Sequence, residues 1–270
     1  MNRADIIREL ENRGHQVTIK DNLKNGVVFE GIVIMNNSPI ATVIYTEKLI
    51  ADAVALGKSV ADVTDIILEI YEAHKNQDFD VQAFTDADWI LEHIYVAIQR
   101  TSDEPLIKKS SELEGLELYL YLKDAISDGS FSIKLTQEHL SNANIELSAA
   151  WDKAVANTCA DTVILSMSEI MAEMLGAPAE EMDIPLWIIS NTRRIKGASA
   201  IINRTALSQF ASEFGTDILV VIPSSTHEMI ILPFKDDMDI DYFSNMVKEV
   251  NDSEVAPEER LTDRAYLLKV

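Results

Sequence analysis

The sequence predicts an α+β protein on three observations. Apolar residues alternate over short runs near the N-terminus, recur at helical spacing in the middle of the chain, and fall in the C-terminal third into a repeated pattern of strand, turn, strand and helix. The chain has 270 residues, of which 47% are hydrophobic and 25% charged, so it has an ordinary globular composition and the length of two domains. We expect an N-terminal domain over residues 1–112 and a C-terminal domain over residues 113–270.

The N-terminal domain is predicted to be a three-strand meander with helices. The expected elements are a helix over 4–13, strands over 16–20, 27–35 and 40–45, and helices over 59–74 and 86–100. Asn25-Gly26 is typical of a tight hairpin turn, and residues 36–39 have turn chemistry as well. Ser59 followed three residues later by Asp62 indicates a capped helix start.

The C-terminal domain is predicted to form an antiparallel sheet backed by helices. A hairpin through Asp128-Gly129 joins expected strands over 116–126 and 131–135, and helices are expected from 136, over 151–160 and over 167–175. The repeated unit then consists of strands over 185–190 and 197–202 with a helix over 204–214, and strands over 217–222 and 229–233 with a helix over 241–250. We expect its four strands to form one sheet, with 265–270 as a further edge strand.

Composition favours a cytoplasmic protein. The first residues are polar and charged, unlike an export signal, and the aliphatic runs at 32–35 and 218–222 are too short to cross a membrane. Cys159 is the only cysteine, so no internal disulfide is possible, which suits a reducing compartment. We therefore expect no membrane association.

The charge distribution argues against a nucleic-acid binder. The formal net charge is −22, from 45 acidic and 23 basic residues. Residues 59–180 alone carry 23 acidic and 7 basic residues, a balance of −16. Such a surface repels phosphate backbones, so direct binding of nucleic acid is not expected. One functional alternative is that the acids mimic nucleic-acid phosphates, and the other interpretation is a solvated surface.

The sequence contains no motif for a metal or a nucleotide. The five histidines are scattered without the spacing of a zinc site, and neither phosphate-binding glycine motif is present. Asp237, Asp239 and Asp241 have the first spacings of a calcium loop, but Tyr242 and Lys248 occupy the positions that require Gly and Glu. We therefore expect no metal and no cofactor, and the aspartates favour the start of a helix instead.

Two polar turns of the repeated unit hold the candidate binding residues. These residues are Asn191, Arg193 and Arg194, beside Lys196, in the first turn and Ser224, Ser225, His227 and Glu228 in the second. If the two hairpins are neighbours in one sheet, the turns lie at the same end of it and form one rim with donors for an anionic group or a carboxylate partner. The alternative is a pair of exposed hairpin tips whose charges keep an edge soluble.

A hydrolase is the enzymatic alternative. Ser225 as nucleophile and His227 as base have the residue types of a catalytic set, with Glu228 nearby. In a strand, however, Ser225 and His227 lie about 6.5 to 7 Å apart on one face while Glu228 points to the other. We therefore assign no catalytic residues.

Segments in several parts of the chain resemble a known family. The stretches 190–198, 222–233 and 250–263, with 26–32 and the segment around Trp151 and Ala156-Asn157-Thr158, are similar to an uncharacterised family of Firmicutes proteins known as domain of unknown function 5688. The resemblance implies a bacterial, intracellular protein and no particular activity. Together with the two polar turns, it leads us to expect a non-enzymatic binding or adaptor protein whose partner is an unknown protein or a small anionic ligand.

Overall fold

The computed structural model describes residues 1–36, 42–75, 81–123, 132–176 and 184–270, and it divides the chain into two compact units. The first unit is Met1–Val81 and the second is Gln82–Val270. The division therefore falls earlier than the expected boundary after residue 112. The reason is that the strands between 94 and 123 share one continuous hydrophobic core with the helices and strands of the C-terminal part.

The first unit packs helices against a small antiparallel sheet. Its elements are α1 (Arg3–Asn12), β1 (Val17–Ile19), β2 (Asn22–Lys24), β3 (Val27–Phe29), β4 (Gly31–Ile34), β5 (Val43–Tyr45), α2 (Glu47–Ala55) and α3 (Val60–His74). The sheet has the order β1-β4-β5, and β2 and β3 form a separate hairpin. Asn25 and Gly26 turn this hairpin with φ angles of 49° and 81°, the left-handed values that a tight hairpin turn requires.

Local signals predicted most of the first unit. Ser59 and Asp62 form the expected capping box at the start of α3, where the Ser59 side chain accepts from the Asp62 N–H. The expected strand over 27–35 is divided into β3 and β4, and helix α2 was not predicted. Part of the expected turn at 36–39 lies outside the described residues. Ile6, Leu10, Ile32 and Ile67 are among the fully buried residues of this core.

The second unit begins with a sheet that has one aliphatic and one polar face. Its first elements are η1 (Val81–Thr85), α4 (Ala87–His93), β6 (Ile94–Arg100), β7 (Lys108–Ser110), β8 (Leu116–Lys123), β9 (Ser132–Lys134), α5 (Gln137–Asn142) and α6 (Leu147–Ala160). The order is β6-β8-β7, with β9 also paired to β8. On one face Leu118 and Leu120 lie opposite Ile98 and Val96. On the other face Tyr121 lies opposite Tyr95, and Glu117 opposite Gln99.

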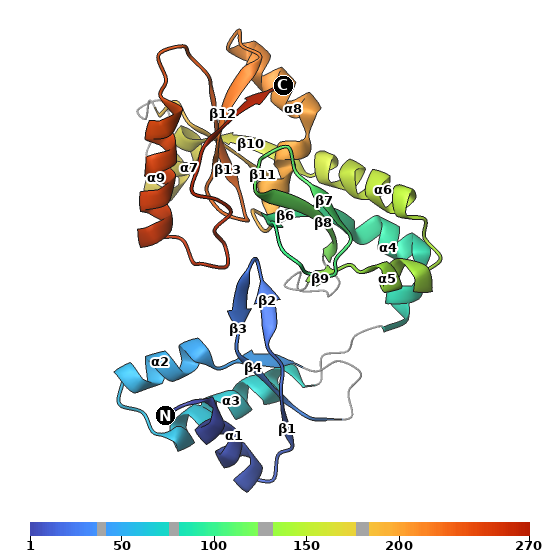
Figure 1. The fold of residues 1–270 in the computed structure, drawn as a ribbon, viewed down its shortest axis with the longest axis vertical. Helices are drawn as coiled ribbons and strands as arrows, with labels where there is room; N and C mark the ends of the chain where they lie inside the picture. The colour runs from blue at the N-terminus through green and yellow to red at the C-terminus, as the bar shows by residue number, and fades with distance from the viewer. Residues whose placement is uncertain (37–41, 76–80, 124–131, 177–183) are drawn as a thin grey trace. The chain divides into compact units, whose positions relative to one another are not determined.

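A second antiparallel sheet carries the repeated unit. Its elements are β10 (Thr162–Ser166), α7 (Met167–Leu175), β11 (Trp187–Asn191), η3 (Gly197–Ile202), α8 (Arg204–Glu213), β12 (Ile218–Pro223), β13 (Met229–Pro233), α9 (Ile240–Ser253) and β14 (Tyr266–Lys269). The strand order is β10-β11-β13-β12-β14. Helix α9 packs on one face through Val247 against Val220, and α8 packs on the other with Leu207 and Phe210 (Figure 1). The α+β class and the edge strand β14 are as expected.

Two predicted elements of the second unit were wrong or incomplete, and one strand was missed. The expected helix over 86–100 ends at His93 and continues as β6, because both faces of 94–100 are buried against other elements and a buried strand needs no alternation. The segment 197–202, expected to be a strand, is the 3₁₀ helix η3, so it is not one of the strands of the second sheet. Strand β10, which was not predicted, pairs with β11 instead. The predicted hairpin turn at Asp128-Gly129 lies outside the described residues.

Side chains from α6 and η3 satisfy the outer edge of β6. Strand β6 is the last in its sheet, so its outward backbone groups need partners other than a strand. The Val96 N–H donates to Thr158 Oγ1 (2.9 Å), and the Val96 carbonyl accepts from Ser199 Oγ (2.6 Å). Asn157 Nδ2 donates to the Ile94 carbonyl (2.8 Å). Thr158 and Ser199 are 6% and 2% exposed, so water cannot replace them.

Replacing Thr158 by Val tests this edge. Valine has the same shape but leaves the buried Val96 N–H without an acceptor, so we expect the free energy of unfolding to fall by about 1–3 kcal/mol. Tryptophan fluorescence during denaturation with guanidinium measures it, because all three tryptophans lie in the second unit. Thr205→Val, on the exposed surface of α8, is the matched control. Equal losses in the two variants would contradict this account.

Candidate functional site

The two polar turns singled out in the sequence lie side by side. Strand β11 ends at Asn191, and β13 begins at Met229 and pairs antiparallel with β11, with Ile189 opposite Met229. Two hydrogen bonds then join the turns directly. The Lys196 N–H donates to His227 Nδ1 (3.2 Å), and Ser190 Oγ donates to the His227 carbonyl (2.8 Å). Residues 191–196 and 224–228 therefore form one continuous rim at this end of the sheet, called the turn rim below.

Asn191 holds the first turn in a fixed shape. Its Oδ1 accepts from the N–H groups of Arg193 and Ile195, each at 3.2 Å, and its Nδ2 donates to the Ile195 carbonyl at 2.8 Å. The Asn191 residue is 8% exposed. Arg194 and Lys196 adopt left-handed φ angles of 52° and 54°, which side-chain bonds of this kind stabilise. The Arg193 and Arg194 side chains are exposed on the outside of the turn.

The second turn is braced by its own serine and by a distant glutamate. Ser225 Oγ accepts from the His227 N–H (3.0 Å), and the Ser225 N–H donates to the Glu228 carbonyl (3.2 Å). The Glu259 carbonyl accepts from the Thr226 N–H (2.8 Å), and its carboxylate lies 3.3 Å from His227 Nε2. Ser224 and Glu228 are partly exposed in the same turn. Sequence reasoning missed Glu259, because nothing local relates two residues 32 positions apart.

Both imidazole nitrogens of His227 have partners other than a serine. Nδ1 accepts from a backbone N–H, so the ring proton is on Nε2, where Glu259 accepts it. In the part of the chain that the structure describes, no hydrogen bond joins the Ser225 hydroxyl to an imidazole. A general base needs a free nitrogen facing the nucleophile. The geometry therefore does not favour hydrolysis through Ser225 and His227.

The Lys196 side chain lies against the polar face of the β6-β8-β7 sheet, within the same unit. Its Nζ is 6.0 Å from the centre of the Tyr121 ring. Burial lowers the pKa of Lys196, and the negative charge of Glu104 opposes this shift. Glu104 itself pairs with Lys134 at 2.7 Å, and burial raises the pKa of the neighbouring Tyr119 to about 12. The first turn thus presents arginines outward and one lysine inward.

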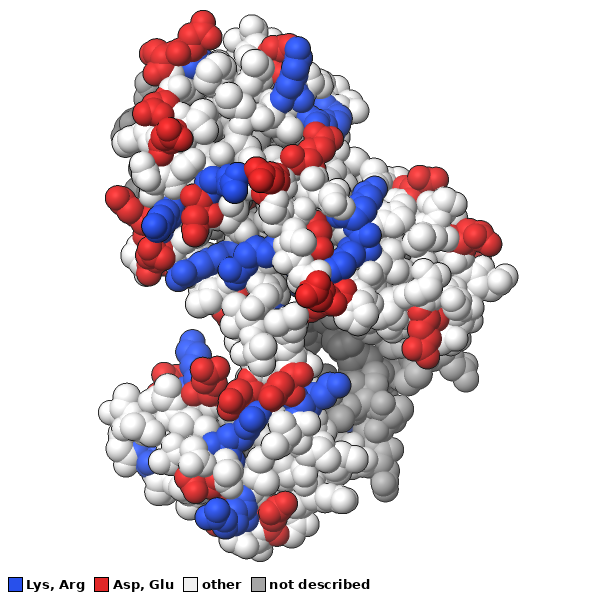
Figure 2. Space-filling model, in the orientation of Figure 1, with Lys and Arg blue, Asp and Glu red and all other residues white. Residues whose placement is uncertain are grey.

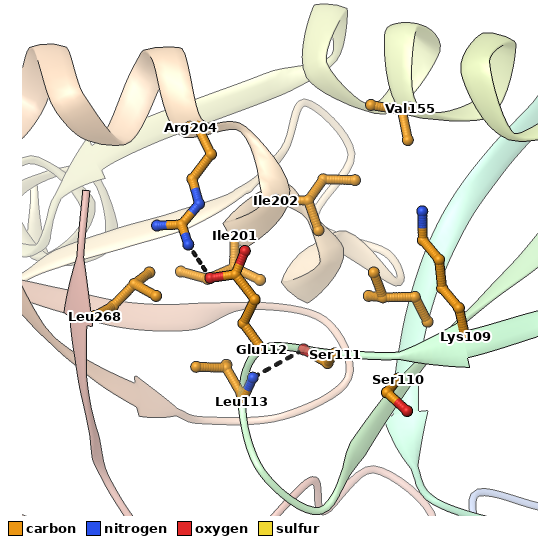
Figure 3. Close-up of a pocket in the computed structure, with 11 residues that line it drawn as sticks. Lys109, Ser110, Ser111, Glu112, Leu113, Val155, Ile201, Ile202, Arg204 and Leu268 are labelled. Atoms are coloured by element: carbon orange, nitrogen blue, oxygen red, sulfur yellow. Dashed lines mark hydrogen bonds and ion pairs between the residues drawn. The ribbon is translucent and has the colours of Figure 1, made fainter.

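Figure 3 shows a separate pocket in the second unit, lined by residues from β7, the loop that follows it, β8, α6, η3, α8 and β14. Arg204 and Glu112 form an ion pair across its mouth, and Lys109 lies on the other side. Sequence reasoning did not find it, because its walls come from six elements and a loop, and no single segment carries a signature.

The acidic residues do not form one surface on the face that Figure 2 shows. Red and blue side chains are dispersed among uncharged ones. A phosphate mimic requires a continuous acidic surface, so this view does not favour that alternative. Within the described ranges, no group of three or more His, Cys, Asp or Glu residues could hold a metal ion. Asp239 instead caps α9 by accepting from the Asp241 N–H at 2.9 Å.

Comparison with known proteins gives one result. A family model described as a family of unknown function (DUF5688) matches residues 3–269, which confirms the resemblance found in the sequence. No curated protein and no solved structure shows a significant match. The structure describes no helix with the length and apolar character that spanning a membrane requires.

Replacing Gly197 by Ala tests how tightly the two turns are joined. A Cβ at this position would lie 2.2 Å from Ser190 Oγ, 2.6 Å from the Asn191 nitrogen and 2.8 Å from the His227 carbonyl oxygen. Because backbone atoms cannot move aside cheaply, we expect a loss of about 3 kcal/mol in the free energy of unfolding. Gly215→Ala is the control, since a Cβ there meets no atom and costs only its left-handed φ, roughly 1 kcal/mol. Equal losses of stability in the two variants, measured by thermal or urea unfolding, would refute the close contact at Gly197.

Replacing Lys196 by Met tests the buried ammonium. Because the pKa of Lys196 is lowered in the folded state, the unfolded chain binds more protons, and wild-type stability gains as the pH rises towards 10.5. We expect the variant to be more stable at neutral pH and its advantage to shrink as the pH rises from neutral towards 10.5. Urea denaturation across that range measures this difference. Lys153→Met, on the exposed side of α6, should show no such trend. A pH-independent advantage for Lys196→Met would contradict the assignment.

Proposed function

We propose a non-enzymatic binding or adaptor function for this chain, which belongs to the family of unknown function DUF5688 over residues 3–269. The proposed contact surface is the turn rim, with Arg193 and Arg194 as the groups that bind a partner. The partner is a protein or a small molecule that presents carboxylate or phosphate groups.

The observation that supports this proposal is a rigid turn with two exposed arginines. Asn191 fixes the turn through three hydrogen bonds, and His227 joins it to the neighbouring hairpin. A guanidinium group on a fixed backbone donates two parallel hydrogen bonds to a carboxylate or phosphate with little further loss of entropy. A mobile loop would lose more entropy on binding.

The charge of the whole molecule makes this position distinctive. The chain carries −22, yet residues 191–196 contain three basic and no acidic side chains. An anionic partner is repelled over most of the surface and attracted at the turn rim, so complementarity there favours one orientation of binding. Ser225 supports the rim, since its hydroxyl accepts from the His227 N–H.

The double variant Arg193→Ala/Arg194→Ala tests the proposal. Both side chains are exposed and neither belongs to a hydrophobic core, so the double variant should keep its fold, which circular dichroism and thermal unfolding check. We expect wild-type protein to retain a stoichiometric partner from lysate of its source cells, and the double variant to lose it. Mass spectrometry identifies the retained species, and moderate salt should weaken the interaction.

A charge-matched control separates the turn rim from general electrostatics. Lys153→Ala/Lys248→Ala removes the same charge from exposed positions on α6 and α9. This control should keep the partner. Retention of the partner by Arg193→Ala/Arg194→Ala would reject the turn rim as the contact surface.

A further inference from the structure

The pocket of Figure 3 is a second candidate binding site, distinct from the turn rim. Its volume is about 290 Å³. Its lining is Lys109, Ser110, Ser111, Glu112, Leu113, Leu118, Val155, Ile201, Ile202, Arg204 and Leu268, all within the second unit. The members fall into two classes, aliphatic side chains and a small polar group.

The floor of the pocket is aliphatic and well ordered by packing. Leu113, Leu118 and Ile201 are 3%, 7% and 5% exposed. Leu118 lies directly opposite Lys109 in the β7–β8 pair, so the strand register places the lysine stem on the same face as the floor. Val155 and Leu268 close it from α6 and β14. None of the described residues that line it is aromatic, so the surface suits a flexible hydrocarbon chain and not a flat ring.

Two cations stand on opposite sides of the mouth. Lys109 Nζ lies 4.1 Å from the centre of the Trp151 ring, and the described residues provide no carboxylate within ion-pair distance of it. Arg204 donates to the Lys269 carbonyl at 2.8 Å and pairs with Glu112. The Glu112 side chain is 67% exposed, so this pair contributes little and a competing carboxylate can replace it. Lys109, Arg204 and Glu112 together leave one net positive charge.

We propose that this pocket binds a medium-chain aliphatic monocarboxylate. The carboxylate lies between Lys109 and Arg204, where it displaces Glu112, and the chain runs over Leu118 towards Ile201. A volume of 290 Å³ corresponds to roughly ten non-hydrogen atoms at about 30 Å³ each, which is the size of octanoate. An aliphatic floor beneath a few placed polar groups is the usual construction of a small-molecule site.

Titration calorimetry of the full chain with octanoate tests the proposal. We expect saturable binding of one molecule per chain. Octanol, which lacks the charge, should bind at least tenfold more weakly. Butyrate, which lacks four methylene groups, should bind roughly a hundredfold more weakly. Octylamine should not bind, because it brings a positive charge to the two cations.

Two substitutions at the mouth have opposite expected effects. Lys109→Met should weaken octanoate binding about tenfold or more, because it removes a charge-assisted hydrogen bond. Glu112→Gln should strengthen it several-fold, because the carboxylate that competes for Arg204 is lost, and an exposed residue of this kind does not risk the fold. Lys153→Met, on α6 but outside the pocket, should leave the affinity unchanged.

The outcomes decide the proposal clearly. Opposite shifts in Lys109→Met and Glu112→Gln, with an unchanged Lys153→Met, would support it. Absence of saturable octanoate binding in both wild type and Glu112→Gln would overturn it. So would equal affinity for octanoate and octylamine, since that pattern reports nonspecific burial of the chain alone.

Discussion

Strand β6 lies at the edge of its sheet, and the rest of the second unit depends on how that edge is buried. A buried backbone group without a partner costs as much as a lost hydrogen bond or more. Thr158 and Ser199 supply partners to the Val96 N–H and carbonyl, and Asn157 supplies one to Ile94. These three side chains belong to two elements, α6 and η3. These hydrogen bonds therefore fix the positions of α6 and η3 against β6, and the shared hydrophobic core fills the space between the elements.

The turn rim inherits its position from this arrangement. Ser199 follows Gly197 by two residues, so the bond from Ser199 to Val96 anchors the chain directly after the first turn. Lys196 connects the turn rim to the β6-β8-β7 sheet. Its N–H donates to His227, and its ammonium group lies over the polar face of that sheet. The segments that resemble the family include Asn157, Thr158 and Gly197. At those positions the residues that carry the resemblance stabilise the fold.

Sequence reasoning succeeded where a feature depends on neighbours in the chain. The Ser59 cap, the Asn25-Gly26 turn and the end of α7 at Leu175 were all predicted from local chemistry. It failed for 94–100, where burial on both faces removes the alternation that separates strand from helix. It placed the two turns at one end of a sheet, but it could not supply Glu259 or the pocket. Those depend on contacts between residues far apart in sequence.

The first turn contains two kinds of position: some that cannot be substituted without disturbing the fold, and others that can. Asn191 and Gly197 are held by contacts within the fold, whereas Arg193 and Arg194 lie exposed on the outside of the turn. Substitutions at 193 and 194 can therefore change the charge and reach of this surface at little cost in stability. A scaffold of this kind allows partner choice to diverge between related proteins while the architecture stays the same, in the way that antibody loops vary on a constant framework.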